Sequence, residues 1–302
     1  MWPVFAEAIA GLARQKLRTW ASVARAVATL LQSRSDRPYS HVVADEAQDL
    51  SPARLLFLRT LVAPGDDDIT LAADIGQRIY RRPFSWFAAG LDIRGRASRL
   101  RVSYRSTQQI LSLADRVVLP PVSEGQEDLS RDAVAVRAGP KPRLVRCASA
   151  AKETEVVADW IRACFDDGIP AAQIAIFART STMVERVGAK AARLAGTKWA
   201  ELKDEREPDG HAVMLGTIHA AKGLEFRAVA VIGCGRDLIP LPSVLTATTS
   251  ARDTALAEAS ERQLLYVALT RARDLLLVTW TGEPSSYLEQ EWLSEVTAPL
   301  AS

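Results

Sequence analysis

Short apolar runs alternate along the chain with polar loops and amphipathic segments. The apolar runs predict β-strands at 42–44, 69–73, 100–102, 143–147, 174–177, 213–215, 228–232 and 275–281. Apolar residues at helical spacing predict helices at 4–31, from 51 onward, after 107, around 156–161 and ending near 272. The repeated order of strand, polar loop and helix predicts an α/β fold, with parallel sheets and helices on both faces.

Two stretches show neither pattern. Residues 119–142 are polar and rich in proline and glycine, so we expect a loop there. Residues 196–211 carry a dense cluster of charges, and we expect them to be solvated. The polar residues that carry information about function instead follow directly on the short strands.

Composition limits the kind of protein but does not identify it. The chain has 302 residues, enough for two ordinary domains, and a net charge of +2 that gives no overall basic character. A site for a polyanion must therefore come from local clustering of charge. The longest apolar runs are too short to cross a bilayer, so we expect no membrane partner. The three cysteines, with no Cys-x-x-Cys pair, are interpreted as buried small residues in a reducing, cytoplasmic compartment.

The most informative polar cluster is Asp45-Glu46, directly after the apolar run 42–44. Ser51-Pro52 follows, an N-cap and first-turn pair that predicts a helix start. Carboxylates at the carboxyl end of a parallel strand lie in the crevice where α/β sheets bind ligands. One of them can hold a divalent metal while the other handles a proton. An exposed acidic turn before a helix is the plainer interpretation, and further stretches downstream argue against it.

Five stretches together resemble the helicase motifs II to VI of the UvrD/Rep type within superfamily 1, in the order of that family. They are Asp45-Glu46-Ala47-Gln48-Asp49, Asp74-x-x-Gln77-x-x-Tyr80, Tyr104-Arg105-Ser106, Thr217-x-His219-x-x-Lys222-Gly223-Leu224-Glu225-Phe226 and Tyr266-Val267-Ala268-x-Thr270-Arg271-Ala272. The resemblance implies tandem RecA-like domains with parallel sheets. The first, over residues 1–98, would be incomplete and carry motifs II and III. The second, over residues 99–302, would carry motifs IV, V and VI.

The resemblance also implies the chemistry of ATP hydrolysis. Asp45 would hold Mg²⁺, and Glu46 would orient and deprotonate the attacking water. Gln77 resembles the family's γ-phosphate sensor. Arg105 and Arg271 match two arginines that reach the γ-phosphate, a role suited to a planar guanidinium that stays charged and binds phosphate oxygens bidentately.

Further residues are implied to hold the rest of the ligands. Tyr104 would stack on the adenine, Glu225 would meet the ribose or the coupling network, and Gly223 would allow close backbone approach. Single-stranded DNA would contact four residues of the two domains, namely Tyr80, Trp86, Thr217 and His219. For the neighbouring Phe84 and Phe87 we favour a place in the core, and the arginines at 78, 81 and 82 are as readily a solvated face as a phosphate contact.

The sequence departs from the family in three places. The phosphate-cradling loop, Gly-x-x-x-x-Gly-Lys-Ser/Thr, is missing, and no Gly-Lys dipeptide occurs in the chain. The connection from Arg179 to Thr217 is too short for the extra domain that UvrD-type members insert there. Ala73 stands where the family usually has glycine.

These departures leave three alternatives open. The chain is expected to be the C-terminal portion of an ATP-dependent DNA helicase or translocase that moves 3′ to 5′ on single-stranded DNA, and to be inactive alone. A split enzyme whose partner chain brings the phosphate loop is the second alternative. A non-catalytic DNA-binding or regulatory module with relict motifs is the third.

Overall fold

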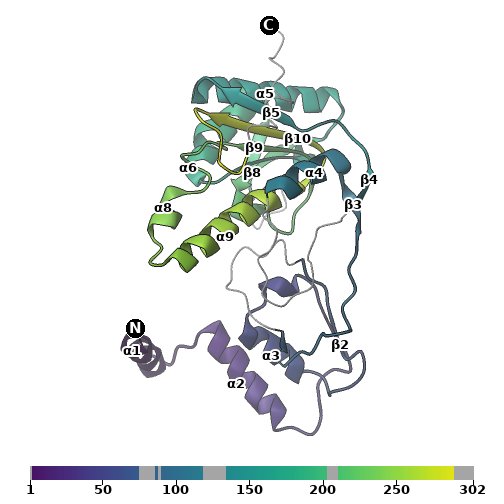
Figure 1. Ribbon diagram of the computed structural model, residues 1–302, viewed down its shortest axis with the longest axis vertical. Coiled ribbons are helices and arrows are strands. Elements are labelled where there is room, and N and C mark those ends of the chain that lie inside the picture. Colours follow the sequence, from purple (N-terminus) through teal and green to yellow (C-terminus); the bar gives the residue numbers. More distant parts are fainter. Residues whose placement is uncertain (1, 75–85, 88–89, 118–133, 203–209, 289–302) are drawn as a thin grey trace. The chain divides into compact units, whose positions relative to one another are not determined.

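The computed structural model describes residues 2–74, 86–87, 90–117, 134–202 and 210–288. The chain divides into two compact units, Met1–Ser98 and Arg99–Ser302 (Figure 1). Among the described residues, no helix is long and apolar enough to cross a membrane.

The first unit contains a pair of short parallel strands and several helices. Its elements are α1 (Trp2–Arg14), α2 (Trp20–Gln32), β1 (Val42–Ala44), η1 (Ala47–Asp49), α3 (Pro52–Thr60) and β2 (Ile69–Leu71). β1 and β2 pair in parallel, with Val42 opposite Ile69. Ser51 is the N-cap of α3, as the sequence predicts, and its hydroxyl accepts a hydrogen bond from the Arg54 amide at 3.3 Å. Parallel pairing places Asp45 and Asp74, which both follow their strands, at the same edge.

The single helix predicted over 4–31 is wrong, because α1 ends at Arg14 and α2 begins at Trp20. Lys16 adopts a left-handed backbone conformation with φ of 57°, which a right-handed helix cannot contain. Thr19 then caps α2 by accepting a hydrogen bond from the Ser22 amide at 3.1 Å. Periodicity alone misses this break, since neither glycine nor proline marks it.

The second unit is built on a sheet of six parallel strands in the order β5-β10-β9-β6-β8-β7. These strands are β5 (Arg143–Cys147), β6 (Ile174–Ala178), β7 (Lys198–Glu201), β8 (Ala212–Thr217), β9 (Phe226–Ile232) and β10 (Ala272–Thr281). All of their pairings are parallel, so the predicted α/β class is confirmed. The last strand, β10, does not lie at an edge of the sheet but between β9 and β5.

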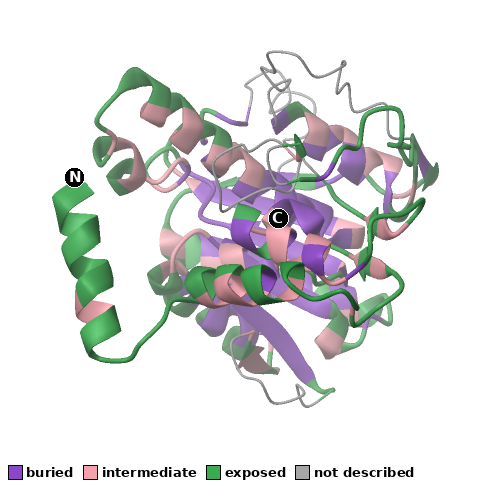
Figure 2. Ribbon diagram, turned by 90° about the horizontal axis from the view of Figure 1, so that it is seen from below, coloured by how far each residue is buried: buried purple, intermediate pink, exposed green. Residues whose placement is uncertain are grey.

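Helices cover both faces of this sheet, as predicted (Figure 1). They are α4 (Gln108–Val117), α5 (Ala150–Asp166), η4 (Ala171–Gln173), α6 (Ser181–Met183), η5 (Val184–Ala189), α7 (Lys190–Leu194), η6 (Ile218–Ala221), α8 (Pro242–Thr246) and α9 (Ala251–Thr270). α5 packs Val157 and Ile161 onto alternate strand residues such as Ile176 and Ala230. The residues between them, such as Ala175 and Val229, point to the opposite face. α4 and α9 lie on that side, and Figure 2 shows the strands between the layers as buried.

Three segments differ from the sequence prediction. The strand expected at 100–102 is β3 (Val102–Thr107), so the polar motif lies on the strand and not after it. Part of the expected loop 119–142 is β4 (Val134–Arg137), which pairs in parallel with β3 as a separate two-stranded sheet. Part of the expected solvated segment 196–211 is the edge strand β7. β3 and β7 have no apolar run to reveal them, and the short apolar run of β4 lies in a stretch whose proline and glycine content favours a loop.

A buried glutamate joins α5 to the sheet. One carboxylate oxygen of Glu153 accepts hydrogen bonds from the Gly233 amide at 2.9 Å and the Thr279 hydroxyl at 2.6 Å. Its other oxygen has no hydrogen-bond partner within the described part of the chain. Burial raises the pKa of Glu153, and the two hydrogen bonds offset this only in part. The ionised carboxylate therefore costs stability at neutral pH.

Glu153→Gln should stabilise the fold at pH 7 by roughly 1 kcal/mol, because it removes a buried charge and keeps an oxygen that accepts both bonds. The folded-state pKa is raised, so the cost of ionisation sets in as pH rises above the unfolded-state pKa of about 4.3. Thermal unfolding followed by circular dichroism should show the gain at pH 7 and lose it near pH 4.

The matched control is Glu155→Gln on the same helix, where the carboxylate is exposed and pairs with Lys152 at 2.9 Å. This change should stay within about 0.5 kcal/mol at either pH. An equal gain from Glu153→Gln at both pH values would contradict the explanation by buried charge.

Candidate nucleotide and nucleic-acid site

The two carboxylates of the first unit lie together where β1 ends. Asp45 follows Ala44 directly, and its Oδ1 accepts a hydrogen bond from the Glu46 amide at 2.8 Å. Glu46 has a left-handed backbone with φ of 50° and precedes η1. The Ala47 amide donates to the Ala72 carbonyl at 2.9 Å, which fixes this turn against the loop after β2. The turn therefore presents both carboxylates at the edge where parallel strands place ligands.

Gln48 holds the two loops of this edge together, a role that the sequence analysis missed. Its buried side chain donates through Nε2 to the Glu46 carboxylate and accepts through Oε1 from the Asp74 amide at 3.0 Å. The residue predicted to activate water is thus oriented by an amide from its own motif. The sequence singles out Gln48 only as a member of motif II. Nothing around it in the sequence indicates that its side chain bonds both Glu46 and Asp74.

The structure describes only some of the residues between Asp74 and Phe87 that the sequence analysis singled out. Gln77, Tyr80 and Phe84 lie outside the described residues. Trp86 is half-buried and packs against the small apolar cluster of Leu55 and Leu91.

Phe87 contradicts the prediction of a core residue. It is 65% exposed, with the Arg94 guanidinium 5.1 Å above its ring. A cation over the ring face compensates in part for the lost burial.

In the second unit, motifs IV, V and VI meet at the amino ends of β9 and β10. Arg105 on β3 pairs through Nε with Glu225 at 2.8 Å, and Glu225 directly precedes β9. The second oxygen of Glu225 lies 3.8 Å from Arg273, near the start of β10. Tyr104, beside Arg105, is 74% exposed. Arg105, Glu225 and Arg273, of which the first two are 120 positions apart, thus form one half-exposed cluster, and the exposed Tyr104 is next to Arg105 in sequence.

Arg271 lies beneath this cluster and is buried. Its Nε donates to the Val267 carbonyl at 3.1 Å and its Nη1 to the Leu224 carbonyl at 3.0 Å. Its own carbonyl accepts from the Phe226 amide at 3.0 Å. The structure therefore places Arg271 as a link between motifs V and VI. Contact with a γ-phosphate stays a prediction for this residue.

Gly223 adopts a left-handed conformation with φ of 77°, and a side chain there would meet no atom within 4 Å. The glycine is therefore explained by its backbone conformation, and the predicted close approach of a ligand stays untested. The turn that it makes leads the chain from η6 to Glu225 at the start of β9.

Thr217 and His219 lie elsewhere, at the carboxyl edge of the sheet. Thr217 ends β8 and His219 lies in η6. Burial lowers the pKa of His219, and the nearby Arg179 lowers it further. Arg179 forms a buried bidentate pair with Glu261 of α9, at 2.9 and 2.7 Å. The predicted DNA contacts and the predicted nucleotide contacts of this unit thus occupy different ends of the strands.

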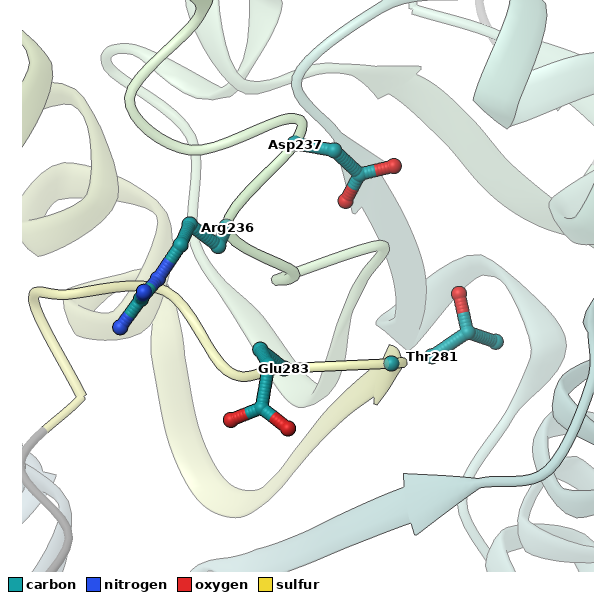
Figure 3. A pocket seen from close by; sticks show the side chains of 5 residues that line it. Arg236, Asp237, Thr281 and Glu283 are labelled. Atoms are coloured by element: carbon teal, nitrogen blue, oxygen red, sulfur yellow. The ribbon is translucent and has the colours of Figure 1, made fainter.

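A shallow hollow of about 350 Å³ lies beyond the carboxyl ends of β9 and β10 (Figure 3). Arg236, Asp237 and Glu283 line it, and none of the predicted site residues does. Within the described ranges, no group of three His, Cys, Asp or Glu side chains could hold a metal ion. A metal at Asp45 would therefore need its remaining ligands from water or from a phosphate, as Mg²⁺ commonly does.

Comparisons with known proteins find similar sequences among DNA helicases. Residues 193–283 match the family model described as UvrD-like helicase C-terminal domain. DNA helicase IV of Escherichia coli K12 is 27% identical over 281 residues, which cover 88% of this chain and 37% of that protein. ATP-dependent DNA helicase UvrD2 of Mycobacterium tuberculosis H37Rv is 26% identical over 337 residues, covering 80% and 47%. ATP-dependent DNA helicase PcrA of Staphylococcus aureus is 35% identical over 103 residues, covering 32% and 13%.

The family-model match and these similarities confirm the predicted resemblance to UvrD/Rep-type helicases of superfamily 1. They support a correspondence of this chain to the C-terminal portion of such helicases, and residues 193–283 are the part that the family model covers. The chain spans about half or less of the length of these relatives. The alignment with UvrD2 runs over 337 residues, more than the 302 of this chain, so that relative carries segments that this chain lacks.

Gly223→Ala should destabilise the second unit by about 1 kcal/mol, because any residue with a Cβ is strained in the left-handed region. Gly210→Ala is the matched control, since that glycine also faces open space but has no positive φ. Chemical denaturation measures both. Equal effects of the two changes would show that the backbone conformation at Gly223 is not the constraint.

Proposed function

We propose that this chain is the part of an ATP-dependent DNA helicase that couples ATP hydrolysis to movement on single-stranded DNA. The observation that carries the proposal is the convergence of motifs IV, V and VI in the Arg105–Glu225 pair at 2.8 Å and the Arg271–Leu224 bond at 3.0 Å. The similarity to three DNA helicases, two of them named as ATP-dependent, supports it. The family resemblance implies 3′-to-5′ movement, and the three free, buried cysteines favour a cytoplasmic location.

In this proposal the carboxylates of the first unit act on water and metal. Asp45 is exposed at the end of β1 and has the hard oxygen ligands that Mg²⁺ prefers. Mg²⁺ bound with ATP supplies charge neutralisation at the phosphates. Glu46, oriented by Gln48, accepts the proton of the attacking water. Gln77 completes this group as the sensor of the γ-phosphate.

The second unit contributes positive charge and a stacking surface. Arg105 leaves Glu225 to bind the γ-phosphate and stabilises the charge that spreads over it during transfer. Arg271 acts at the same phosphate from its place between motifs V and VI. Tyr104 offers an exposed ring to the adenine, while Glu225 and the turn at Gly223 lie close by for the ribose.

Single-stranded DNA binds at a separate place, consistent with the separation of the two edges in the second unit. Tyr80 and Trp86 stack on bases, and Thr217 and His219 contact the strand. Stacking tolerates any sequence because every base has a flat face. The low pKa of His219 keeps its imidazole neutral at physiological pH, so it acts as a hydrogen-bonding group and not as a cation.

The phosphate loop comes from outside residues 1–302 in this proposal, from a longer chain or from a partner chain. Without it the β- and γ-phosphates lack their backbone cradle and lysine, so the chain alone should bind Mg-ATP weakly and turn it over negligibly. The competing function is that of a DNA-binding module without catalysis. In that case Arg105 and Arg271 only stabilise the fold, through their contacts with Glu225 and Leu224.

Glu46→Gln tests the proposal in a protein whose phosphate loop is supplied by fusion or by a partner chain. The change should abolish DNA-stimulated ATP hydrolysis and leave ATP affinity within about threefold, since it removes the base and not the metal ligand. Phosphate release and nucleotide titration measure the two effects.

Asp49→Asn is the matched control, a neighbouring carboxylate of the same motif with no proposed role in hydrolysis, and it should keep most of the turnover. Near wild-type turnover of Glu46→Gln would mean that the carboxylate pair only begins the turn. The competing module would then be the better function.

The chain should bind short single strands of DNA weakly, without sequence preference and with shallow salt dependence, because its net charge of +2 allows few phosphate contacts. Tyr80→Ala or Trp86→Ala should weaken binding more than removal of Arg81 and Arg82 together, by about 1 to 3 kcal/mol per lost stack. Fluorescence anisotropy with a labelled oligonucleotide measures this. Thermal unfolding of Trp86→Ala serves as a control, because Trp86 also packs on the apolar cluster.

The opposite result has a clear meaning. If Tyr80→Ala and Trp86→Ala leave the affinity for DNA unchanged and removal of Arg81 and Arg82 abolishes binding, the DNA is held by a simple patch of positive charge. The proposed path of the DNA across the aromatic residues would then be wrong.

A further inference from the structure

Motif IV lies on an irregular part of β3. Ser103 pairs with Ala135 and Thr107 pairs with Arg137, so the three residues from Tyr104 to Ser106 face a single residue of β4. A bulge of this kind redirects side chains and leaves backbone groups without ladder partners. It turns Tyr104 and Arg105 outward, where both are exposed.

Side-chain hydrogen bonds between β3 and other strands hold this bulge. The Arg105 carbonyl accepts a hydrogen bond from Arg137 Nη1 of β4 at 2.9 Å. The Ser106 hydroxyl donates to the Ala272 carbonyl at the start of β10, at 2.7 Å. The position of Arg105 thus depends on what fixes Arg137.

Arg137 is fixed by Asp274 of β10. Its Nη2 donates to Asp274 Oδ1 at 2.6 Å, and the other carboxylate oxygen accepts from Arg227 Nε of β9 at 2.9 Å. Burial acts to raise the pKa of Asp274, but the hydrogen bonds from Arg227 and Arg137 outweigh it and lower the pKa. The carboxylate is therefore ionised at neutral pH, and its two oxygens tie β4 and β9 to β10.

We propose that Asp274 and Arg137 are positioning residues for Arg105, and that they hold the bulge of β3 so that the Arg105 guanidinium faces the nucleotide phosphates. The proposal rests on the proposed function for the identity of the ligand. The contacts span four strands, β3, β4, β9 and β10, and each is a charged or backbone hydrogen bond. The two-stranded β3–β4 sheet is too small to hold such a bulge by itself.

A simple count of charges makes the opposite prediction. Asp274→Asn removes a negative charge close to Arg105, so Coulomb attraction alone would strengthen the binding of an anion. Loss of positioning instead weakens it, because the guanidinium no longer faces the phosphates. The sign of the change therefore separates the two explanations.

The test uses the full chain with tripolyphosphate at millimolar concentration, followed by NMR. Arg105→Ala and Asp274→Asn should each weaken binding by about three- to tenfold, and the double variant should be no weaker than Arg105→Ala alone. Arg137→Lys keeps the charge and loses the fork that joins the Arg105 carbonyl to Asp274, so it should behave like Asp274→Asn. Asp159→Asn, which removes a carboxylate from an exposed pair with Arg162 on α5, is the matched control.

A second measurement does not depend on the ligand. The rate at which phenylglyoxal modifies Arg105, read by mass spectrometry against Arg146 in the same sample, should rise several-fold in Asp274→Asn and Arg137→Lys. Release of Arg105 from Glu225 causes this rise. An unchanged rate in both variants would overturn the proposal, as would tighter binding of tripolyphosphate by Asp274→Asn.

The two measurements also separate this proposal from the proposed function. If Arg105→Ala binds tripolyphosphate as tightly as the wild type does, the proposed contact of Arg105 with the nucleotide phosphates is wrong. A faster modification rate in Asp274→Asn would still support the positioning of Arg105 by Asp274.

Discussion

The parallel pairing of β9 with β10 determines where the site of the second unit lies. Phe226 stands opposite Ala272 in this pairing, so the residues that precede the two strands, Glu225 and Arg271, become neighbours. Parallel strands cannot be joined by a tight turn, and α9 supplies the long crossover between them. The buried guanidinium of Arg271 then closes the gap by bonding the Leu224 carbonyl at 3.0 Å. Motifs V and VI meet because they lead into neighbouring strands at the same edge of the sheet.

The sequence was sufficient for elements in which burial dominates. β6 and β9 are continuous apolar runs because both faces are covered, and they appear where the pattern predicts them. β3 extends beyond the predicted 100–102 because its further residues are mostly polar, and β4 was missed because its short apolar run lies in a stretch rich in proline and glycine. The break between α1 and α2 depends on the positive φ of Lys16, which the residue type lysine does not predict.

The candidate site was predictable to a similar degree. The resemblance to helicase motifs supplied the residues that touch ligands in the family, and the structure brings Arg105 and Glu225 together at 2.8 Å. The sequence does not show which groups the orienting residues bond. Gln48 joins Glu46, two positions away, to Asp74, 26 positions away, and Arg137 bonds Asp274, 137 positions away, so only the folded chain reveals these contacts.

The bridge made by Gln48 limits which amino acid can occupy that position. Its side chain donates a hydrogen bond to the Glu46 carboxylate and accepts one from the Asp74 backbone amide. A carboxylate in its place could only accept, and would set a third negative charge against Glu46, whereas lysine could only donate. Of residues with this length, the primary amide alone combines both capacities without carrying charge. The residue that joins the loops after β1 and β2 therefore does not itself change charge with pH.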